Sequence, residues 1–133
     1  MIIEYEFKTQ MGHPSSYAYV RFDCQPAHEL SFQSTATWPT DLSAEWITSF
    51  EAGVSDGVVE GLLCSLSLIP FIGCSLTLVE IKYDEVSSSP YSFYRATRRA
   101  MTDFTKDTLH RWQIWPLDYL GGIGGKPVTA PAA

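Results

Sequence analysis

Three glycines spaced four residues apart constrain the fold of this 133-residue chain more than any other feature. Gly53, Gly57 and Gly61 lie in a segment whose apolar residues also recur at every fourth position, from Trp46 to Leu62. That period predicts an amphipathic helix over residues 41–63. Each glycine costs a helix about 1 kcal/mol relative to alanine, so close packing of the helix backbone must offset the cost. A sheet is the simplest surface for such packing.

The flanks of this segment fit a helix of a globular domain. Thr40, Asp41 or Ser43 can cap its first turn, because a short oxygen-bearing side chain accepts hydrogen bonds from unpaired amide groups. Glycines at this spacing also occur in membrane helices that pair, but Asp56 and Glu60 in the same segment exclude that interpretation. No window has the run of about 18–20 uncharged apolar residues that spans a bilayer. We therefore expect no membrane contact.

The acidic N-terminus lacks the basic start of a signal peptide, which predicts a cytoplasmic protein.

Elsewhere the apolar residues alternate, as in strands with one buried face. The alternation predicts strands over residues 3–8, 17–26, 29–37 and 71–83, the first two forming a hairpin, and a last strand over residues 111–115. In the fourth strand Cys74, Leu76 and Leu78 share one face, which would continue to Glu80. Ser89 and Pro90 begin a second amphipathic helix, extending to about residue 109.

The order of these elements predicts an α+β fold, with an antiparallel-rich sheet and both helices on one of its faces. The length suits a single domain, which we place at residues 1–117. Residues 118–133 are rich in Gly, Pro and Ala, a composition that predicts a flexible tail.

Charge is distributed unevenly along the chain, whose net charge is -6. Residues 1–90 contain three Lys and Arg against twelve Asp and Glu, whereas residues 91–133 contain six against three. Arg95, Arg98 and Arg99 share one face of the second helix, a spacing suited to contact with phosphates. The same spacing equally suits a solvated face paired with Asp103 and with the acidic first helix.

None of the motifs of catalysis, metal binding or nucleotide binding occurs in this sequence with the residue spacing that it requires. The stretch 120–127 is similar to a phosphate-binding loop, but Pro127 stands where a Ser or Thr would hold magnesium, and no helix follows. The three histidines and three cysteines lack metal-ligand spacing, and the cysteines are expected to be buried free thiols. No histidine is placed to activate the serines at 87–89, which helix capping explains better. Asp84 and Glu85, as neighbours on a strand, would point to opposite faces. We expect no enzyme, no cofactor and no metal.

Several short motifs, taken in order, resemble the fourth domain of elongation factor G. They are the helix around Glu51-Ala52-Gly53-Val54, the strand Leu76-Thr77-Leu78, the loop with Tyr83, Val86 and Ser88-Ser89, Phe93 in the second helix, and the closing segment 112–117. Upstream, residues 9–20 are similar to the glycine-rich loop of the family. The resemblance covers residues 3–117.

This resemblance implies a two-layer α+β sandwich: a four-stranded sheet, two helices on one face, and a left-handed βαβ crossover, which is contrary to the usual right-handed preference. It also implies a non-catalytic module that is associated with the ribosome or RNA, because the family's domain projects into the decoding region and touches RNA through two loops at its tip. The loops correspond here to residues 10–16 and 82–86. The implied tip residues are Gly12, His13, Pro14, Ser15, Ser16, Tyr83, Asp84 and Glu85. Arg95, Arg98 and Arg99 are candidates for further phosphate contacts, and the expected partners are the ribosome, its RNA or a translation factor.

The tip loops depart from the family's pattern in charge. Asp84 stands in place of the tip histidine, and the family's Gly-Gly-Arg-Gly has become Gln10-Met11-Gly12-His13-Pro14, which has no arginine. A carboxylate beside phosphates is repulsive. This chain carries no GTPase domain, so we expect it to bind no nucleotide.

Two other functions stay open. The first is a protein-interaction module that keeps the fold and docks a partner on Tyr17, Tyr19, Trp112 and Trp115. The second is a small enzyme of another kind.

Overall fold

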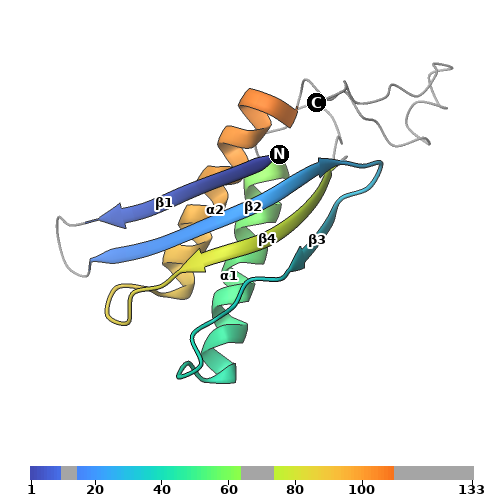
Figure 1. The fold of residues 1–133 in the computed structure, drawn as a ribbon. Coiled ribbons are helices and arrows are strands. Elements are labelled where there is room, and N and C mark those ends of the chain that lie inside the picture. The colour runs from blue at the N-terminus through green and yellow to red at the C-terminus, as the bar shows by residue number, and fades with distance from the viewer. Residues whose placement is uncertain (10–14, 64–73, 110–133) are drawn as a thin grey trace, which may run out of the picture.

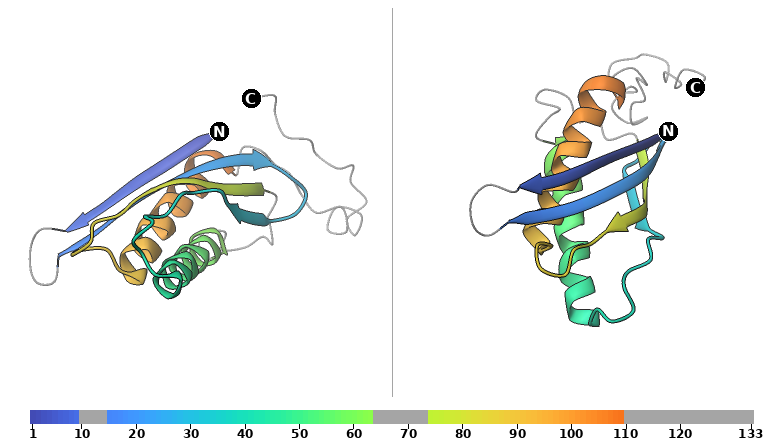
Figure 2. Two further views of the ribbon diagram at one scale, coloured as in Figure 1. Left: turned by 60° about the horizontal axis from the view of Figure 1, so that its bottom comes forward. Right: turned by 60° about the vertical axis from the view of Figure 1, so that its left-hand side comes forward.

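The computed structural model describes residues 1–9, 15–63 and 74–109, which form a two-layer α+β sandwich. Its strands are β1 (Ile2–Thr9), β2 (Ser16–Pro26), β3 (Ser31–Ser34) and β4 (Cys74–Lys82). Its helices are α1 (Ala44–Leu63) and α2 (Pro90–Phe104), and α2 continues into a π-helical turn, η1 (Thr105–Leu109). Both helices cover the same face of the sheet, as Figure 1 and the left view of Figure 2 show. The predicted class and layering are confirmed.

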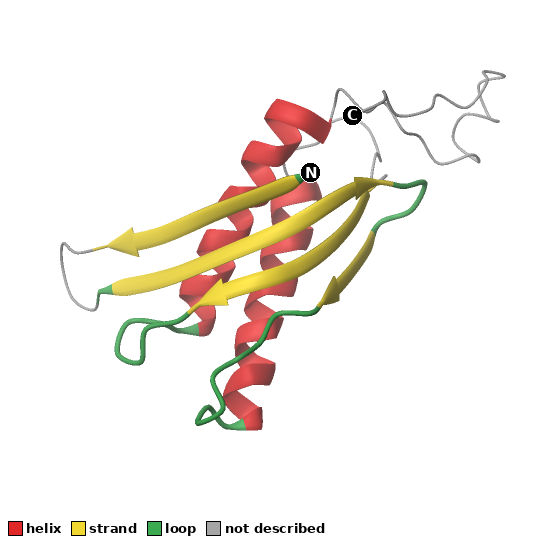
Figure 3. Ribbon diagram, in the orientation of Figure 1, coloured by secondary structure: helices red, strands yellow, loops and turns green. Residues whose placement is uncertain are grey.

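The sheet has the order β1-β2-β4-β3. The pairs β1–β2 and β2–β4 are antiparallel, whereas β3 and β4 are parallel, so α1 connects two parallel neighbours. Figures 1 and 3 show the sheet in front of the two helices. Seen from the opposite side, with the helices toward the viewer and β3 and β4 pointing upward, β4 lies to the left of β3. The crossover is therefore left-handed, the rare hand that the resemblance implies.

The core lies between the sheet and the two helices. Alternation along β2 and β4 directs one set of side chains inward, and the helices meet them with their apolar faces. The buried side chains are Ala18, Val20, Phe22 and Cys24 of β2, Cys74, Leu76 and Leu78 of β4, Phe50, Val54, Val58 and Leu62 of α1, and Phe93, Ala96, Ala100, Met101 and Phe104 of α2. Cys24 and Cys74 are free buried thiols, as expected, while Cys64 lies outside the described residues.

The three glycines of α1 face α2. A Cβ added to Gly57 would lie 2.7 Å from the Thr97 Cβ, and one added to Gly61 would lie 2.5 Å from the Met101 Cβ. Gly53 likewise meets the backbone of Pro90. Close packing does offset the helix cost, but our expectation of a sheet as the packing surface was wrong. Both helices lie side by side on one face, so they are each other's nearest backbone.

The β2–β4 ladder contains an irregularity that changes the facing of Glu80. Arg21 pairs with Glu80 while Phe22 pairs with Leu78, so Val79 is an extra residue. The extra residue turns Glu80 to the open face of the sheet, where its carboxylate lies 3.8 Å from the Arg21 guanidinium. The expectation that Glu80 continues the core face was wrong, because a bulge shifts every later side chain by one position.

Several element ends differ from the predicted ones. β3 is shorter than predicted because the chain leaves the sheet after Thr35, whose amide donates to the Leu78 carbonyl over 2.9 Å. α1 begins at residue 44, and Ser43 is its cap, since its Oγ accepts from the Trp46 amide. Ser89 caps α2 as predicted, in a reciprocal capping box with Ser92.

The remaining predictions concern the C-terminal part of the chain and the membrane. The predicted strand at 111–115, the end of the domain at residue 117 and the tail at 118–133 lie outside the described residues. Among the helices of the described residues, none has both the length and the apolarity to cross a bilayer.

We predict that Gly57→Ala destabilises the fold by about 1–3 kcal/mol, because the added methyl overpacks the α1–α2 contact. On an exposed helix the same change would stabilise, so the sign is diagnostic. Urea unfolding measures the effect, with Ser55→Ala on the exposed face of α1 as the control. An unchanged or raised stability of Gly57→Ala would show that the helices do not meet here.

Candidate functional site

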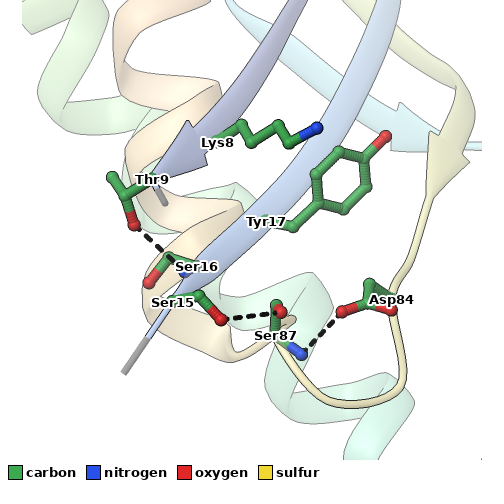
Figure 4. A pocket seen from close by; sticks show the side chains of 7 residues that line it. All are labelled: Lys8, Thr9, Ser15, Ser16, Tyr17, Asp84 and Ser87. Carbon is green, nitrogen blue, oxygen red and sulfur yellow. Dashed lines mark hydrogen bonds between the residues drawn. The ribbon is translucent and has the colours of Figure 1, made fainter. Parts of the chain in front are cut away.

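Two segments far apart in sequence meet at one end of the sheet. We call this end the tip and define it as residues 8–9, 15–17 and 83–89 (Figures 1 and 4). It contains five of the predicted tip residues: Ser15, Ser16, Tyr83, Asp84 and Glu85. The other three, Gly12, His13 and Pro14, lie outside the described residues.

Hydrogen bonds join the start of β2 to the segment between β4 and α2. The Ser88 hydroxyl donates to the Tyr17 carbonyl over 2.7 Å, and the Tyr17 amide donates to the Ser87 carbonyl over 3.1 Å. The Ser15 and Ser87 hydroxyls lie 3.1 Å apart and point toward each other (Figure 4). The start of β2, which follows the first predicted loop, is thus joined to the residues that follow the second through backbone and hydroxyl contacts.

Asp84 organises the turn that follows β4. Its carboxylate accepts from the Ser87 amide, its amide donates to the Ser88 hydroxyl, and its carbonyl accepts from the Ser88 amide, each over 2.9 Å. Asp84 and Glu85 lie beyond the strand, so the predicted opposite facing on a strand does not apply to them. Val86 is at the apex with 89% of its surface exposed. Of the three consecutive serines, Ser89 caps α2, whereas Ser87 and Ser88 hydrogen-bond to the start of β2 and so join the two segments of the tip.

A shallow hollow of about 350 Å³ opens between the two tip segments. It is lined by Lys8, Thr9, Ser15, Ser16, Tyr17, Asp84 and Ser87 (Figure 4). Hydroxyl groups, one ammonium and one carboxylate can hydrogen-bond a polar ligand group. Among the described residues, the one histidine is His28, in the β2–β3 connection at the opposite end of β2, and no cluster of three or more His, Cys, Asp or Glu could hold a metal ion.

Sequence reasoning did not place four of the lining residues in the tip loops: Lys8, Thr9, Ser87 and Tyr17, the last of which it named only as a contact for a protein partner. Thr9 and Ser16 are partners in the β1–β2 register, and the Ser16 amide donates to the Thr9 hydroxyl over 3.0 Å. The alternation in the sequence places Lys8 and Tyr17 on one face of the hairpin. The pairing that makes them neighbours depends on the length of the loop between them.

Tyr17 and Tyr19 lie on the open face of the sheet and are both engaged. The Tyr17 hydroxyl donates to Glu6 over 2.9 Å, and the Tyr19 hydroxyl donates to Glu4. Burial, followed by these bonds to carboxylates, raises the pKa of each tyrosine to about 12. Only 9% of Tyr19 is exposed, and the Lys82 ammonium lies 4.6 Å from its ring centroid. Tyr19 therefore presents little surface to a partner, and Trp112 and Trp115 lie outside the described residues.

The three arginines lie along α2, away from the hollow. Arg98 pairs with Glu60 of α1 over 3.4 Å, and Arg99 pairs with Asp103 over 3.3 Å. Both ion pairs expected of a solvated face are therefore present. The Arg95 guanidinium instead lies 5.5 Å from the Phe7 ring centroid and 5.8 Å from that of Tyr91.

We predict that Ser88→Ala loosens the tip without unfolding the domain. The change removes a donor to the Tyr17 carbonyl and an acceptor for the Asp84 amide, a loss of about 1–2 kcal/mol. Hydrogen exchange should accelerate at the Asp84 and Tyr17 amides while the core amides keep their order of protection. The control is Val86→Ala at the exposed apex, which should leave exchange unchanged, and equal exchange in the two variants would show that these bonds do not hold the tip.

We also predict that stability falls in alkaline solution. Burial raises the pKa of Cys24 and Cys74 from 9.0 to about 12, and the pKa values of Tyr17 and Tyr19 rise from 10.0 to about 12. Because the folded state holds these protons more tightly, its stability is complete below about pH 9 and declines as pH rises toward 12. Urea unfolding across this interval measures the decline, which Tyr19→Phe should make shallower. A flat profile would contradict these shifts.

Comparisons with known proteins agree with this fold. The chain matches the model of elongation factor G, domain IV, over residues 2–108, which is most of its length. It is also similar to a crystal structure from Thermus thermophilus, with a TM-score of 0.56 and 24% identity, a likeness that bears on the fold alone. That match covers 77% of this chain and 15% of the other, so this chain spans a small part of that protein's length. Because this match spans well over half of the chain, including all four described strands and both α-helices, the chain belongs to the elongation factor G domain IV family.

Proposed function

We propose that this chain is a non-catalytic, translation-factor-like module that associates with the ribosome in the cytoplasm. The observation that carries the proposal is the tip, where two segments are joined by hydrogen bonds into one protruding end of a domain IV fold. A rigid tip presents its polar groups in a fixed arrangement, which lowers the entropy lost on binding. Its partner is then ribosomal RNA, a ribosomal protein or a translation factor.

The chemistry of the tip suits the binding of a polar partner. The Ser15 and Ser87 hydroxyls hydrogen-bond each other beside the hollow. Such hydroxyls can also bond to phosphate or ribose oxygens, and Lys8 supplies a cation at the rim of the hollow.

The acidic apex limits how the tip meets RNA. Asp84 is engaged within its turn, but Glu85 is exposed and has no such role. A carboxylate that faces phosphates weakens both encounter and contact. The RNA affinity of this chain should therefore fall less steeply with salt concentration than the affinity of a domain that has a cationic tip.

A protein-interaction module is the second candidate, and exposed apolar side chains favour it. Val86 projects from the apex, and Trp46 at the start of α1 is 53% exposed. Large exposed side chains of this kind are typical anchors of protein interfaces. The tyrosine Tyr19, which the sequence suggested for this role, is buried on the open face of the sheet.

Pelleting with purified ribosomal subunits tests the proposed function. We predict binding that weakens as salt is raised, because phosphate contacts release counterions. Glu85→Lys should strengthen it by roughly fivefold, since the change replaces a repulsive charge near phosphates by an attractive one. The matched control is Glu29→Lys, which makes the same change in the exposed connection between β2 and β3.

Three outcomes decide between the candidates. Binding that Glu85→Lys strengthens and Glu29→Lys leaves unchanged supports a tip that faces RNA. Salt-insensitive binding that Val86→Asp abolishes supports a protein partner. No pelleting at any salt concentration contradicts the ribosomal role.

A further inference from the structure

The outer ridge of α2 forms a second polar surface, separate from the tip. Arg95, Arg98, Arg99 and Thr102 surround a hollow of about 230 Å³. α2 packs against α1 on one side and against β1 on the other (Figure 2). Arg98 reaches toward α1, whereas Arg95 and Arg99 reach over the β1 rings of Phe7 and Tyr5. We call these four residues the arginine ridge.

The ion pairs of the ridge leave it with an excess of positive charge. Glu60 contacts Arg98 at Nε, and Asp103 contacts Arg99 at Nε, so two carboxylates face three arginines on the ridge. Within the described residues, no carboxylate pairs with Arg95, whose Nη1 donates to the Tyr91 hydroxyl over 3.1 Å. The ion pairs are solvent-exposed, and such pairs contribute little, about 0–1 kcal/mol. A phosphate that accepts two bonds from a guanidinium fork can therefore compete for the ridge.

Aromatic rings continue the ridge toward the tip. Tyr91 is 55% exposed, and its ring centroid lies 6.0 Å from that of Tyr94. A hydrogen bond to Glu60 raises the pKa of Tyr94 above its usual value. The exposed Tyr91 ring thus has the Tyr94 ring beside it and the Arg95 guanidinium 5.8 Å from its centroid.

Arginines beside an exposed ring suit one kind of nucleic acid better than another. Residues one helical turn apart are about 5–6 Å apart, which is comparable to the distance between successive phosphates of one strand. Duplex RNA keeps its bases stacked inside, whereas an unpaired strand can stack a base on an aromatic side chain. The ridge thus combines the two features that bind unpaired RNA.

We propose that the arginine ridge and Tyr91 form a binding surface for an unpaired RNA segment, with phosphates over the arginines and one base on Tyr91. This inference rests on the proposed function for the class of partner, RNA, but it uses a different surface from the tip. It assigns Arg95, Arg98 and Arg99 to phosphates and Tyr91 to a base.

Fluorescence anisotropy with a labelled unpaired RNA oligonucleotide tests the surface, and the same oligonucleotide annealed to its complement is the duplex probe. Arg95→Gln combined with Arg98→Gln should weaken binding of the unpaired probe by about tenfold. The matched comparison sets Arg98→Gln against Arg21→Gln. Each change removes one arginine bound to a glutamate, but Arg21 lies on the open face of the sheet. Arg21→Gln should change affinity by less than about threefold, and Arg98→Gln should weaken it by more.

Tyr91→Ala and Tyr91→Phe test the stacked base. Alanine should weaken binding by about tenfold, because stacking on a ring is lost, whereas phenylalanine keeps the ring and should bind as the wild type does. Circular dichroism confirms that each variant is folded. Equal losses for alanine and phenylalanine, equal losses for Arg98→Gln and Arg21→Gln, tighter binding of the duplex, or no binding of the unpaired probe would each overturn the inference.

The same variants in the pelleting assay separate this inference from the proposed function. If wild-type protein pellets with subunits and the Arg95 and Arg98 pair behaves as the wild type does in both assays, the ridge is not the surface and the ribosomal role remains. If the protein binds the oligonucleotide through the ridge but never pellets with subunits, the ribosomal role fails and the ridge remains.

Discussion

The backbone contact between α1 and α2 is the constraint on which the other features depend. Gly57 and Gly61 have no side chain, so α2 lies against the backbone of α1 at a distance that any Cβ would prevent. This contact fixes α2 beneath β1 and β2, and its N-terminus then begins at the tip. The capping box of Ser89 and Ser92 starts the helix at that point. Segment 83–89 therefore lies beside the start of β2. Hydrogen bonds from Ser87 and Ser88 to Ser15 and Tyr17 join the two segments of the tip.

Two surfaces of different charge follow from this arrangement. The tip is lined by hydroxyls and ends in an acidic apex, whereas the outer side of α2 carries three arginines between α1 and β1. A domain that met RNA through a cationic tip would need neither an acid at Glu85 nor a cationic helix. In this chain the excess positive charge lies on the outer side of α2, at Arg95, Arg98 and Arg99, and not at the apex. Under the two proposals, the tip orients the module and the ridge holds an RNA strand, so each surface has a role within one family fold.

Local patterns predicted most of the fold, and tertiary pairing decided the rest. The periods of four and of two residues identified α1, β1 and β2, and the serine before Pro90 identified the start of α2. The facing of Glu80 was missed because the bulge at Val79 depends on the neighbouring strand and leaves no local signature. The partner of the glycines was missed for a related reason, since spacing reveals that something packs closely and not which element it is. Within the site, the loops came from a family resemblance, while Lys8 and Tyr17 became neighbours only through the register of the hairpin.

Hydrogen exchange of the protein with and without purified ribosomal subunits tests the central claim most directly, because it locates the bound surface residue by residue. The account predicts that subunits slow exchange of amides at 15–17 and 84–88, since these amides belong to the tip. Amides of β3 and of the β2–β3 connection, at the far end of the sheet, should exchange at the same rate in both samples. Protection confined to β3 and that connection, with the tip unchanged, would contradict a ribosome-facing tip.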